Sequence, residues 1–341
     1  MKTSDFDYDL PQELIAQTPI EPRHNSRLMD VNTQTGELIH RHFYDIKQLL
    51  QPGDLLVLNH TKVIPARLHA RKESGGRVEL LLLRKMDDLT WECLIGGKKM
   101  GPGKRFTVES GPQGVVVEEL LGAKRTVRFD EPIESFLNLA GEMPLPPYIH
   151  ERLQTPDRYQ TVFAETPGSA AAPTAGLHFT QELLREVEAG GVRFAHVTLH
   201  VGLDTFAPVN EDDPQEHHIH KEWCELTEDT AALIRETKAA GKRVIAVGTT
   251  SVRTLESAAR QAAAGEIVLP YQGDTDLYIL PGFQFKVVDA MITNFHLPRS
   301  TLLMLVSAFA GKACIEKAYQ TAIAERYRFF SFGDAMFLHH D

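Results

Sequence analysis

The stretch Arg243-Val244-Ile245-Ala246-Val247-Gly248-Thr249-Thr250-Ser251-Val252-Arg253 decides the fold class of this chain of 341 residues. Residues 243–247, an arginine followed by four apolar residues, are typical of a short buried strand. The glycine and hydroxyl residues that follow are typical of a turn into a helix, which Thr250 or Ser251 opens and which runs to about residue 264. A strand that leads directly into a helix is the building unit of α/β sheets.

The same alternation continues on both sides of this stretch. Thr180 and Thr227 each stand where a hydroxyl can cap a helix, and glycines follow the expected ends of both helices. The expected elements are helices over 180–188 and 227–240, and strands over 192–201 and 54–58. This order of helices and strands predicts an α/β core with a largely parallel sheet.

Residues 63–150 have a different pattern. Short runs rich in strand formers alternate with turns that mostly contain glycine. The expected strands cover residues 77–83, 90–95, 104–108, 114–120 and 124–129. Closely spaced strands of this kind are typical of an antiparallel barrel or sandwich. We therefore expect a discontinuous α/β core, residues 1–62 and 151–341, interrupted by a small antiparallel β domain over 63–150.

Composition limits the functions that fit. The chain has 36 Lys and Arg against 46 Asp and Glu, a formal net charge of −10, so any RNA binding depends on local basic patches. A hydrophobic content of 43% is typical of a globular protein and excludes a fibrous or disordered chain. The three cysteines lie far apart without a Cys-x-x-Cys pair, which argues against a disulfide framework, an iron–sulfur cluster and a zinc ribbon.

The sequence shows no sign of export or of membrane insertion. The N-terminus is acidic and lacks the apolar segment of a signal peptide. The longest apolar run, residues 302–310, has about half the length of a membrane-spanning helix. We expect a cytoplasmic protein. We also find no phosphate-binding loop, no dinucleotide fingerprint, no Gly-x-Ser-x-Gly and no His-Glu-x-x-His, which weakens kinase, dehydrogenase and common hydrolase interpretations.

Three segments at expected strand-to-helix junctions carry candidate site residues. The small-residue loop 169–180 allows close approach of a ligand, with Thr174 and Gly176 as substrate contacts and His178 as an acid or base. The hydroxyls of Thr249, Thr250 and Ser251, with Arg253, suit a carboxylate or a ribose. Asn294 and His296 precede the apolar helix. Each segment also has a structural interpretation. These are a packed histidine in the first, a capped helix in the second, and the start of a core helix in the third.

Two further segments allow several interpretations. In Glu216-His217-His218-Ile219-His220-Lys221-Glu222, the residues His217, His220 and Glu222 resemble three metal ligands, but the match is short and no supporting partner is visible. Two other interpretations fit better: these residues have an active-site role that needs no metal, or the segment is a plain polar loop. His200 lies at the end of the strand expected over 192–201, and Asp204 lies in the turn after it. A core histidine and a turn aspartate are slightly favoured over function for these two residues.

A basic cluster lies among the glycine turns of the β domain. Lys98, Lys99, Lys104 and Arg105 have no acidic residue between them. On a net acidic protein this is a candidate phosphate-contact patch for RNA, although a solvated hairpin is the commoner explanation of such a run.

Taken together, these motifs resemble the S-adenosylmethionine:tRNA ribosyltransferase-isomerase family of queuosine biosynthesis. The resemblance includes Asn59-His60-Thr61-Lys62-Val63-Ile64-Pro65-Ala66-Arg67 and Met291-Ile292-Thr293-Asn294-Phe295-His296-Leu297-Pro298. The other matching segments are residues 10–17, 23–27, 141–149, 157–161, 171–179, 248–251 and 327–336. Asp204 stands where the family usually has glycine, His60 where it has asparagine and Phe163 where it has tyrosine, and Lys221 and Cys224 also depart.

The resemblance implies a fold and a reaction. The fold is a discontinuous, barrel-like α/β core with an inserted antiparallel β-barrel. The reaction moves and isomerises the ribosyl unit of S-adenosylmethionine onto the 7-aminomethyl-7-deazaguanine wobble base of tRNA, and it releases adenine and methionine. S-adenosylmethionine is then a consumed substrate, and neither a resident cofactor nor a metal is expected. We expect a monomer.

This reaction needs a base that removes a ribose proton next to the sulfonium and an acid for the departing adenine. Our hypothesis assigns these steps to His178 and His296, with His217, His220 and Glu222 in reserve. Thr249, Thr250, Ser251 and Arg253 would hold S-adenosylmethionine. Two other classes stay open at this point: an RNA-binding module without chemistry, and a methyltransferase, which the missing glycine fingerprint argues against.

Overall fold

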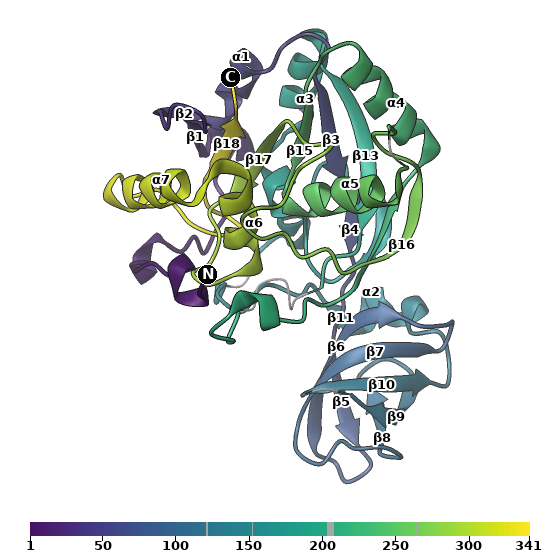
Figure 1. The fold of residues 1–341 in the computed structure, drawn as a ribbon. Helices are drawn as coiled ribbons and strands as arrows, with labels where there is room; N and C mark the ends of the chain where they lie inside the picture. The colour runs from purple at the N-terminus through teal and green to yellow at the C-terminus, as the bar shows by residue number, and fades with distance from the viewer. Residues whose placement is uncertain (121, 152, 203–207, 264) are drawn as a thin grey trace. The chain divides into compact units, whose positions relative to one another are not determined.

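The computed structural model describes residues 1–120, 122–151, 153–202, 208–263 and 265–341 (Figure 1). The chain divides into two compact units. The first comprises residues 1–61, 146–165 and 172–341, and the second comprises residues 62–145 and 166–171. Compared with the boundaries expected from sequence, residues 146–150 belong to the first unit, and residue 62 and residues 166–171 belong to the inserted one.

The first unit is built on a nine-stranded sheet with the order β16-β14-β13-β3-β15-β17-β18-β1-β2. Its strands are β1 (Arg27–Asn32), β2 (Leu38–His42), β3 (Leu55–Asn59), β13 (Arg193–Leu199), β14 (Glu222–Leu226), β15 (Val244–Val247), β16 (Tyr271–Thr275), β17 (Ala290–Asn294) and β18 (Ala335–His339). Strands β13, β3, β15 and β17 are parallel to one another, and β18 is parallel to β1.

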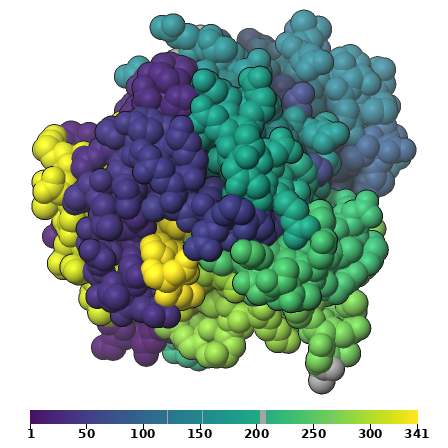
Figure 2. Space-filling view, turned by 90° about the horizontal axis from the view of Figure 1, so that it is seen from above, coloured from purple at the N-terminus to yellow at the C-terminus, as the bar shows by residue number. Residues whose placement is uncertain are grey.

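The expectation of a largely parallel sheet holds for the centre and is wrong at the flanks. Strands β14 and β16 add to β13 antiparallel, and β17 is antiparallel to β18, as β1 is to β2. Between β13 and β14 the described residues contain no α-helix, and a parallel pair would need such a crossover. In the view from above, the yellow C-terminal residues lie directly beside the indigo N-terminal ones, as the β1–β18 pairing requires (Figure 2).

Helices cover both faces of this sheet. They are α1 (Ile46–Leu49), α3 (Gln181–Ala189), α4 (Glu228–Ala239), α5 (Thr249–Gln261), α6 (Thr301–Ala310) and α7 (Lys312–Ala324). Helices α4 to α7 share one apolar core with Val244 and Ala246, and α1 and α3 share the other with Ile245 and Val247. All four residues of β15 are therefore buried, which explains why its sequence is apolar throughout.

The expected helix caps are confirmed. The Thr180 hydroxyl accepts a hydrogen bond from the Leu183 amide at 3.2 Å, and the Thr227 hydroxyl accepts one from the Thr230 amide at 3.3 Å. None of the described helices combines the length and the apolar character that crossing a membrane requires.

The inserted unit is a closed antiparallel barrel. Six strands follow one another in the order β5-β6-β7-β10-β9-β8, and β8 pairs with β5 to close the ring. The elements of this part of the chain are β4 (Thr61–Val63), β5 (Arg67–Lys72), β6 (Arg77–Lys85), β7 (Thr90–Gly96), β8 (Arg105–Val108), β9 (Gln113–Glu119), β10 (Lys124–Phe129), α2 (Leu137–Ala140), β11 (Gly141–Glu142) and β12 (Thr166–Ser169).

All five strands expected over residues 63–150 are present, and the barrel decides between the two architectures that the sequence left open. Strand β5 was missed, because four of its six residues are basic. Only Leu68 and Ala70 point to the interior. One strand glycine is required by packing: a Cβ on Gly114 of β9 would lie 2.5 Å from the Phe106 ring.

Candidate active site

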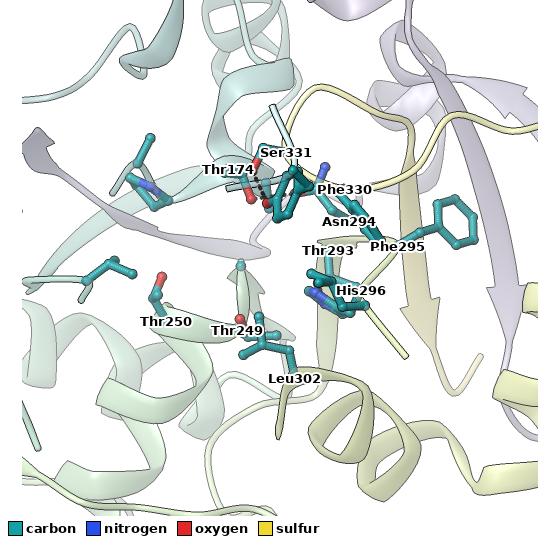
Figure 3. A pocket seen from close by; sticks show the side chains of 17 residues that line it. Thr174, Thr249, Thr250, Thr293, Asn294, Phe295, His296, Leu302, Phe330 and Ser331 are labelled. Atoms are coloured by element: carbon teal, nitrogen blue, oxygen red, sulfur yellow. Dashed lines mark hydrogen bonds between the residues drawn. The ribbon is translucent and has the colours of Figure 1, made fainter. Parts of the chain in front are cut away.

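A pocket that is open to solvent lies in the first unit, at the carboxyl ends of β15 and β17. Parallel strands of open α/β sheets commonly gather ligands at this edge. Figure 3 shows the lining side chains. They come from residues 172–175, 248–250, 293–297 and 330–331, with Tyr148, Val201 and Leu302.

The start of α5 forms one side of the pocket. Gly248 has a φ of +89°, a conformation that favours glycine, and turns the chain from β15 into the helix. Thr249 and Thr250 follow and line the pocket. The Thr250 hydroxyl oxygen is buried and has no hydrogen-bond partner among the described residues, a state that costs about 1–3 kcal/mol. The hydroxyl of Ser251 is already used, since it donates to the Val247 carbonyl at 2.8 Å.

A chain of hydrogen bonds runs into the pocket through Asn294. The Asn294 amide nitrogen donates to Nε2 of His178 at 3.0 Å, and its amide oxygen accepts from the Thr174 hydroxyl at 2.9 Å. Because Nε2 accepts, the ring proton of His178 is on Nδ1, which donates to the Ser26 hydroxyl oxygen at 2.7 Å. This chain fixes the orientation of Thr174 at the pocket wall.

His178 itself is enclosed. Its ring stacks on Phe43 with a centroid separation of 4.9 Å, and it does not line the pocket. Burial, with smaller contributions from the nearby Arg328 and Arg23, lowers the pKa of His178 to about 3. A neutral ring with both nitrogens engaged favours positioning over proton transfer.

His296 differs from His178 because it lines the pocket directly. Its Nε2 lies 2.8 Å from the Thr293 hydroxyl, and its Nδ1 has no hydrogen-bond partner in the described part of the chain. Two tyrosines hold its backbone: the amide donates to the Tyr319 hydroxyl at 2.8 Å, and the carbonyl accepts from the Tyr8 hydroxyl. Burial lowers the pKa of His296 to about 3, so the ring is neutral at pH 7 and Nδ1 carries a free lone pair, although the lowered pKa also makes it a weaker base.

Sequence reasoning missed an aromatic wall. The Tyr148 and Phe330 rings lie 4.8 Å apart, and the Tyr148 hydroxyl contacts the Ser331 hydroxyl at 2.7 Å. Phe330 has a φ of +69°, which is strained for a residue with a side chain and is often found at functional sites. Both segments, 141–149 and 327–336, belong to the matching motifs, but their residue types carry no acid–base signal.

Two candidate residues bind each other instead of lining the pocket. Arg253 forms a buried ion pair with Glu222, and their side chains are 4% and 6% exposed. The Arg253 Nε donates to the Leu277 carbonyl at 3.1 Å, and the Glu222 carboxylate accepts from the Gly202 amide at 2.9 Å. This arrangement favours a structural role for both.

The three residues that suggested a metal site are not brought together. His217 lies 2.9 Å from the Glu211 carboxylate, His220 is exposed, and Glu222 is paired with Arg253. Within the described residues, no three His, Cys, Asp or Glu side chains are grouped so that they could hold a metal ion.

Two other candidates have different outcomes. A Cβ on Gly176 would lie 2.7 Å from the Phe163 ring and 2.9 Å from Thr161, so packing accounts for this glycine, which does not line the pocket. Asp204 lies outside the described residues.

The basic cluster lies in the inserted unit, in and next to the loop between β7 and β8. Lys98, Lys99, Lys104 and Arg105 are exposed, and none of them has a carboxylate partner among the described residues. Three other cations of the barrel are paired, with Arg67–Glu79 at 3.3 Å, Arg71–Glu109 at 3.1 Å and Arg125–Glu119 at 2.7 Å. The loop therefore presents unneutralised positive charge.

Known proteins resemble this chain over its whole length. A family model described as "Queuosine biosynthesis protein" matches residues 3–338. Two relatives are named S-adenosylmethionine:tRNA ribosyltransferase-isomerase. The one from Symbiobacterium thermophilum is 53% identical, and the one from Carboxydothermus hydrogenoformans is 52% identical, each match covering 99% of this chain and 100% of the relative.

A solved structure is also similar. The crystal structure of S-adenosylmethionine tRNA ribosyltransferase from Thermotoga maritima is 42% identical in sequence, with a TM-score of 0.58. The match covers 98% of this chain and 100% of that chain, so it includes both units of the fold.

Proposed function

We propose, since this chain belongs to the queuosine biosynthesis protein family, that the pocket at the carboxyl ends of β15 and β17 is where S-adenosylmethionine binds and reacts. The chain is an enzyme that transfers and isomerises the ribosyl moiety of S-adenosylmethionine onto the 7-aminomethyl-7-deazaguanine wobble base of tRNA. Its products are epoxyqueuosine-tRNA, adenine and methionine. The observation that carries the location is the buried, unpartnered hydroxyl of Thr250.

S-adenosylmethionine has the groups that this pocket lacks. Its carboxylate and ribose hydroxyls can accept the hydrogen bond that the Thr250 hydroxyl does not make inside the protein. The free amides at the start of α5 favour the same electron-rich groups. The Tyr148 and Phe330 rings on the aromatic wall offer flat apolar surface to adenine.

We assign proton transfer to His296. The reaction removes a proton from the ribose carbon next to the sulfonium, and the C–H bonding electrons remain on that carbon. Neutral Nδ1 of His296 can accept this proton, while Nε2–H donates to the Thr293 hydroxyl oxygen. The imidazolium formed in this way can then protonate adenine as it leaves with its bonding pair. In this assignment His296, which lines the pocket, acts first as the base and afterwards as the acid.

The remaining features of the proposal follow from the substrates. S-adenosylmethionine is consumed, so it supplies the ribosyl group without any resident cofactor. We further propose that the enzyme acts as a monomer. A tRNA substrate supports a cytoplasmic location.

Replacing Thr250 by valine is expected to weaken S-adenosylmethionine binding about three- to tenfold, because valine keeps the shape and removes the donor. The same change is expected to leave the free energy of unfolding unchanged or to raise it by up to about 1 kcal/mol, because no protein group is deprived of a partner. Calorimetric titration with S-adenosylmethionine and urea unfolding measure the two effects.

Thr254→Val is the matched control one turn later in α5. The Thr254 hydroxyl is buried and donates to the Thr250 carbonyl at 3.0 Å, so its removal should affect S-adenosylmethionine binding little. Equal affinity of wild type and Thr250→Val for S-adenosylmethionine would refute the assigned position of the ligand.

The basic loop is our proposed tRNA contact. Replacing both Lys98 and Lys99 by glutamine is expected to weaken tRNA binding at physiological salt. It should also reduce the slope of log K against log salt by roughly 0.7–0.9 for each phosphate that the variant no longer neutralises. Filter binding at several salt concentrations measures both quantities, and Lys104 and Arg105 are tested by a second double substitution.

Lys85→Gln serves as the control, because this lysine of the same unit is already paired with Glu134 at 2.5 Å and with Asp88 at 3.2 Å. Its removal should change the slope less. A salt slope that is the same in the wild type and in the double variant would remove this loop from the RNA interface.

A further inference from the structure

Five rings from four segments of the first unit form two neighbouring groups, which we together call the ring strip: Phe163, His196 and His60 in one, and His200 and Trp223 in the other. His60 and His196 are stacked with centroids 5.2 Å apart and planes 13° apart, and His196 lies 6.5 Å from Phe163. His200 stacks on Trp223 at 5.2 Å and 19°. None of these rings has a role in the proposed chemistry.

The ring strip lies at the same edge of the sheet as the pocket. Strands β3 and β13 are parallel to β15 and β17, and their carboxyl ends, at Asn59 and Leu199, are followed directly by His60 and His200. Val201, the next residue after His200, lines the pocket. The strip therefore begins one residue away from the site where S-adenosylmethionine reacts.

Hydrogen bonds hold the strip in place and leave it accessible. Nε2 of His60 lies 2.9 Å from the Thr198 hydroxyl, and Nδ1 of His200 lies 2.9 Å from the Thr61 hydroxyl. His196 is exposed, and the other four rings are partly exposed. Because the stacked rings are held in place and partly exposed, a planar ligand can extend these stacks.

The interaction that the ring strip offers to a ligand is ring stacking and not charge. Burial lowers the pKa of His60, of His196 and, to about 4, of His200, and the nearby His60 depresses the pKa of the other two further, so all three are neutral at pH 7. The Glu165 and Glu225 carboxylates raise the pKa of His60, but burial outweighs them. These two carboxylates also repel phosphate, so a nucleic acid would turn its bases and not its backbone toward the strip.

We propose that the ring strip stacks unpaired bases of the tRNA substrate beside the base that is being modified. The proposal rests on the proposed function, since it requires tRNA at this edge of the sheet. A base that reacts in a pocket must leave its stack, and its neighbours are then without a stacking partner. Proteins that bind single-stranded RNA replace such partners with aromatic and histidine rings.

Trp223 provides a direct readout. The chain has two tryptophans, and Trp91 is buried in the barrel, so Trp91→Phe leaves Trp223 as the single tryptophan, whose emission can be excited selectively over that of tyrosine. The Trp91 indole nitrogen has no hydrogen-bond partner among the described residues, so this change removes no such bond. Titrating the variant with substrate tRNA is expected to quench the Trp223 emission. Saturating tRNA binding without any change of emission would overturn the proposal.

Two substitutions test the energetic contribution. His196→Ala and Phe163→Leu are each expected to raise the KM for tRNA about five- to tenfold, with kcat and the KM for S-adenosylmethionine unchanged. The salt slope of binding should remain as in the wild type, because neither side chain neutralises a phosphate. A KM for tRNA equal to that of the wild type in both variants would contradict base stacking here.

The control is His42→Ala. His42 stacks on Tyr44 at 5.1 Å, but it belongs to β2 at the opposite end of the sheet, so its removal should leave the KM for tRNA unchanged. Failure of the proposed function is recognised separately, because the wild type would then release no adenine from S-adenosylmethionine in the presence of substrate tRNA.

Discussion

Replacement of His296 by alanine is expected to lower the single-turnover rate of adenine release by about 10²- to 10⁴-fold, the usual contribution of a positioned acid–base group. The reason is that Nδ1 of His296 is a basic nitrogen at the pocket wall, without a partner among the described residues. Binding of S-adenosylmethionine should be weakened little, since the Thr250 side of the pocket is unchanged. Rapid quenching followed by chromatography of adenine measures the rate.

Two variants separate chemistry from structure at this position. His296→Gln can keep a hydrogen bond to Thr293 but has no basic nitrogen, so its rate should be as low as that of the alanine variant. His178→Ala removes a ring held by Ser26 and Asn294, and it should lower stability as well as rate. If His296→Ala reacted at nearly the wild-type rate, a different group would be the base.

Replacement of Glu222 by alanine is expected to lower the free energy of unfolding by about 3–5 kcal/mol, because it leaves the buried Arg253 cation without its counter-ion. The Gly202 amide is also deprived of its acceptor. Urea unfolding followed by far-ultraviolet circular dichroism measures the change. Affinity for S-adenosylmethionine should change far less than stability.

The double variant Glu222→Leu with Arg253→Met removes both charges and is expected to recover most of the stability, since similar apolar residues can replace a buried ion pair. The opposite result is a stable Glu222→Ala protein that no longer binds S-adenosylmethionine. It would contradict the structural role and would indicate that Arg253 contacts the substrate.

Local chemistry explains which parts of the fold could be predicted. Thr180 and Thr227 predict helix starts, because the hydroxyl of such a residue accepts a hydrogen bond from the amide three residues later. Both caps are confirmed. The barrel strands follow from alternation between glycine turns. The antiparallel flanks β14 and β16 depend on pairing between distant segments, which no local pattern records. Strand β5 forms a local hairpin with β6, and it was missed because of its basic residues.

The site shows the same division. The expected strand ends and small-residue loops indicated where a ligand site could lie. The structure brings five of the candidate residues to one pocket: Thr174, Thr249, Thr250, Asn294 and His296. Residue type alone did not reveal that Arg253 has a buried counter-ion, or that the Ser251 hydroxyl donates a hydrogen bond to the Val247 carbonyl. It also did not separate His178, with both nitrogens engaged, from His296, with one nitrogen that faces no described protein group.

The most direct test of the account is a crystal structure of the enzyme with S-adenosylmethionine bound. We predict the ligand in the pocket at the carboxyl ends of β15 and β17, with one of its oxygens within hydrogen-bond distance of the Thr250 hydroxyl. The ribose carbon next to the sulfonium should face Nδ1 of His296. S-adenosylmethionine bound elsewhere, or bound here with His296 turned away from the ribose, would contradict the proposed site and its chemistry.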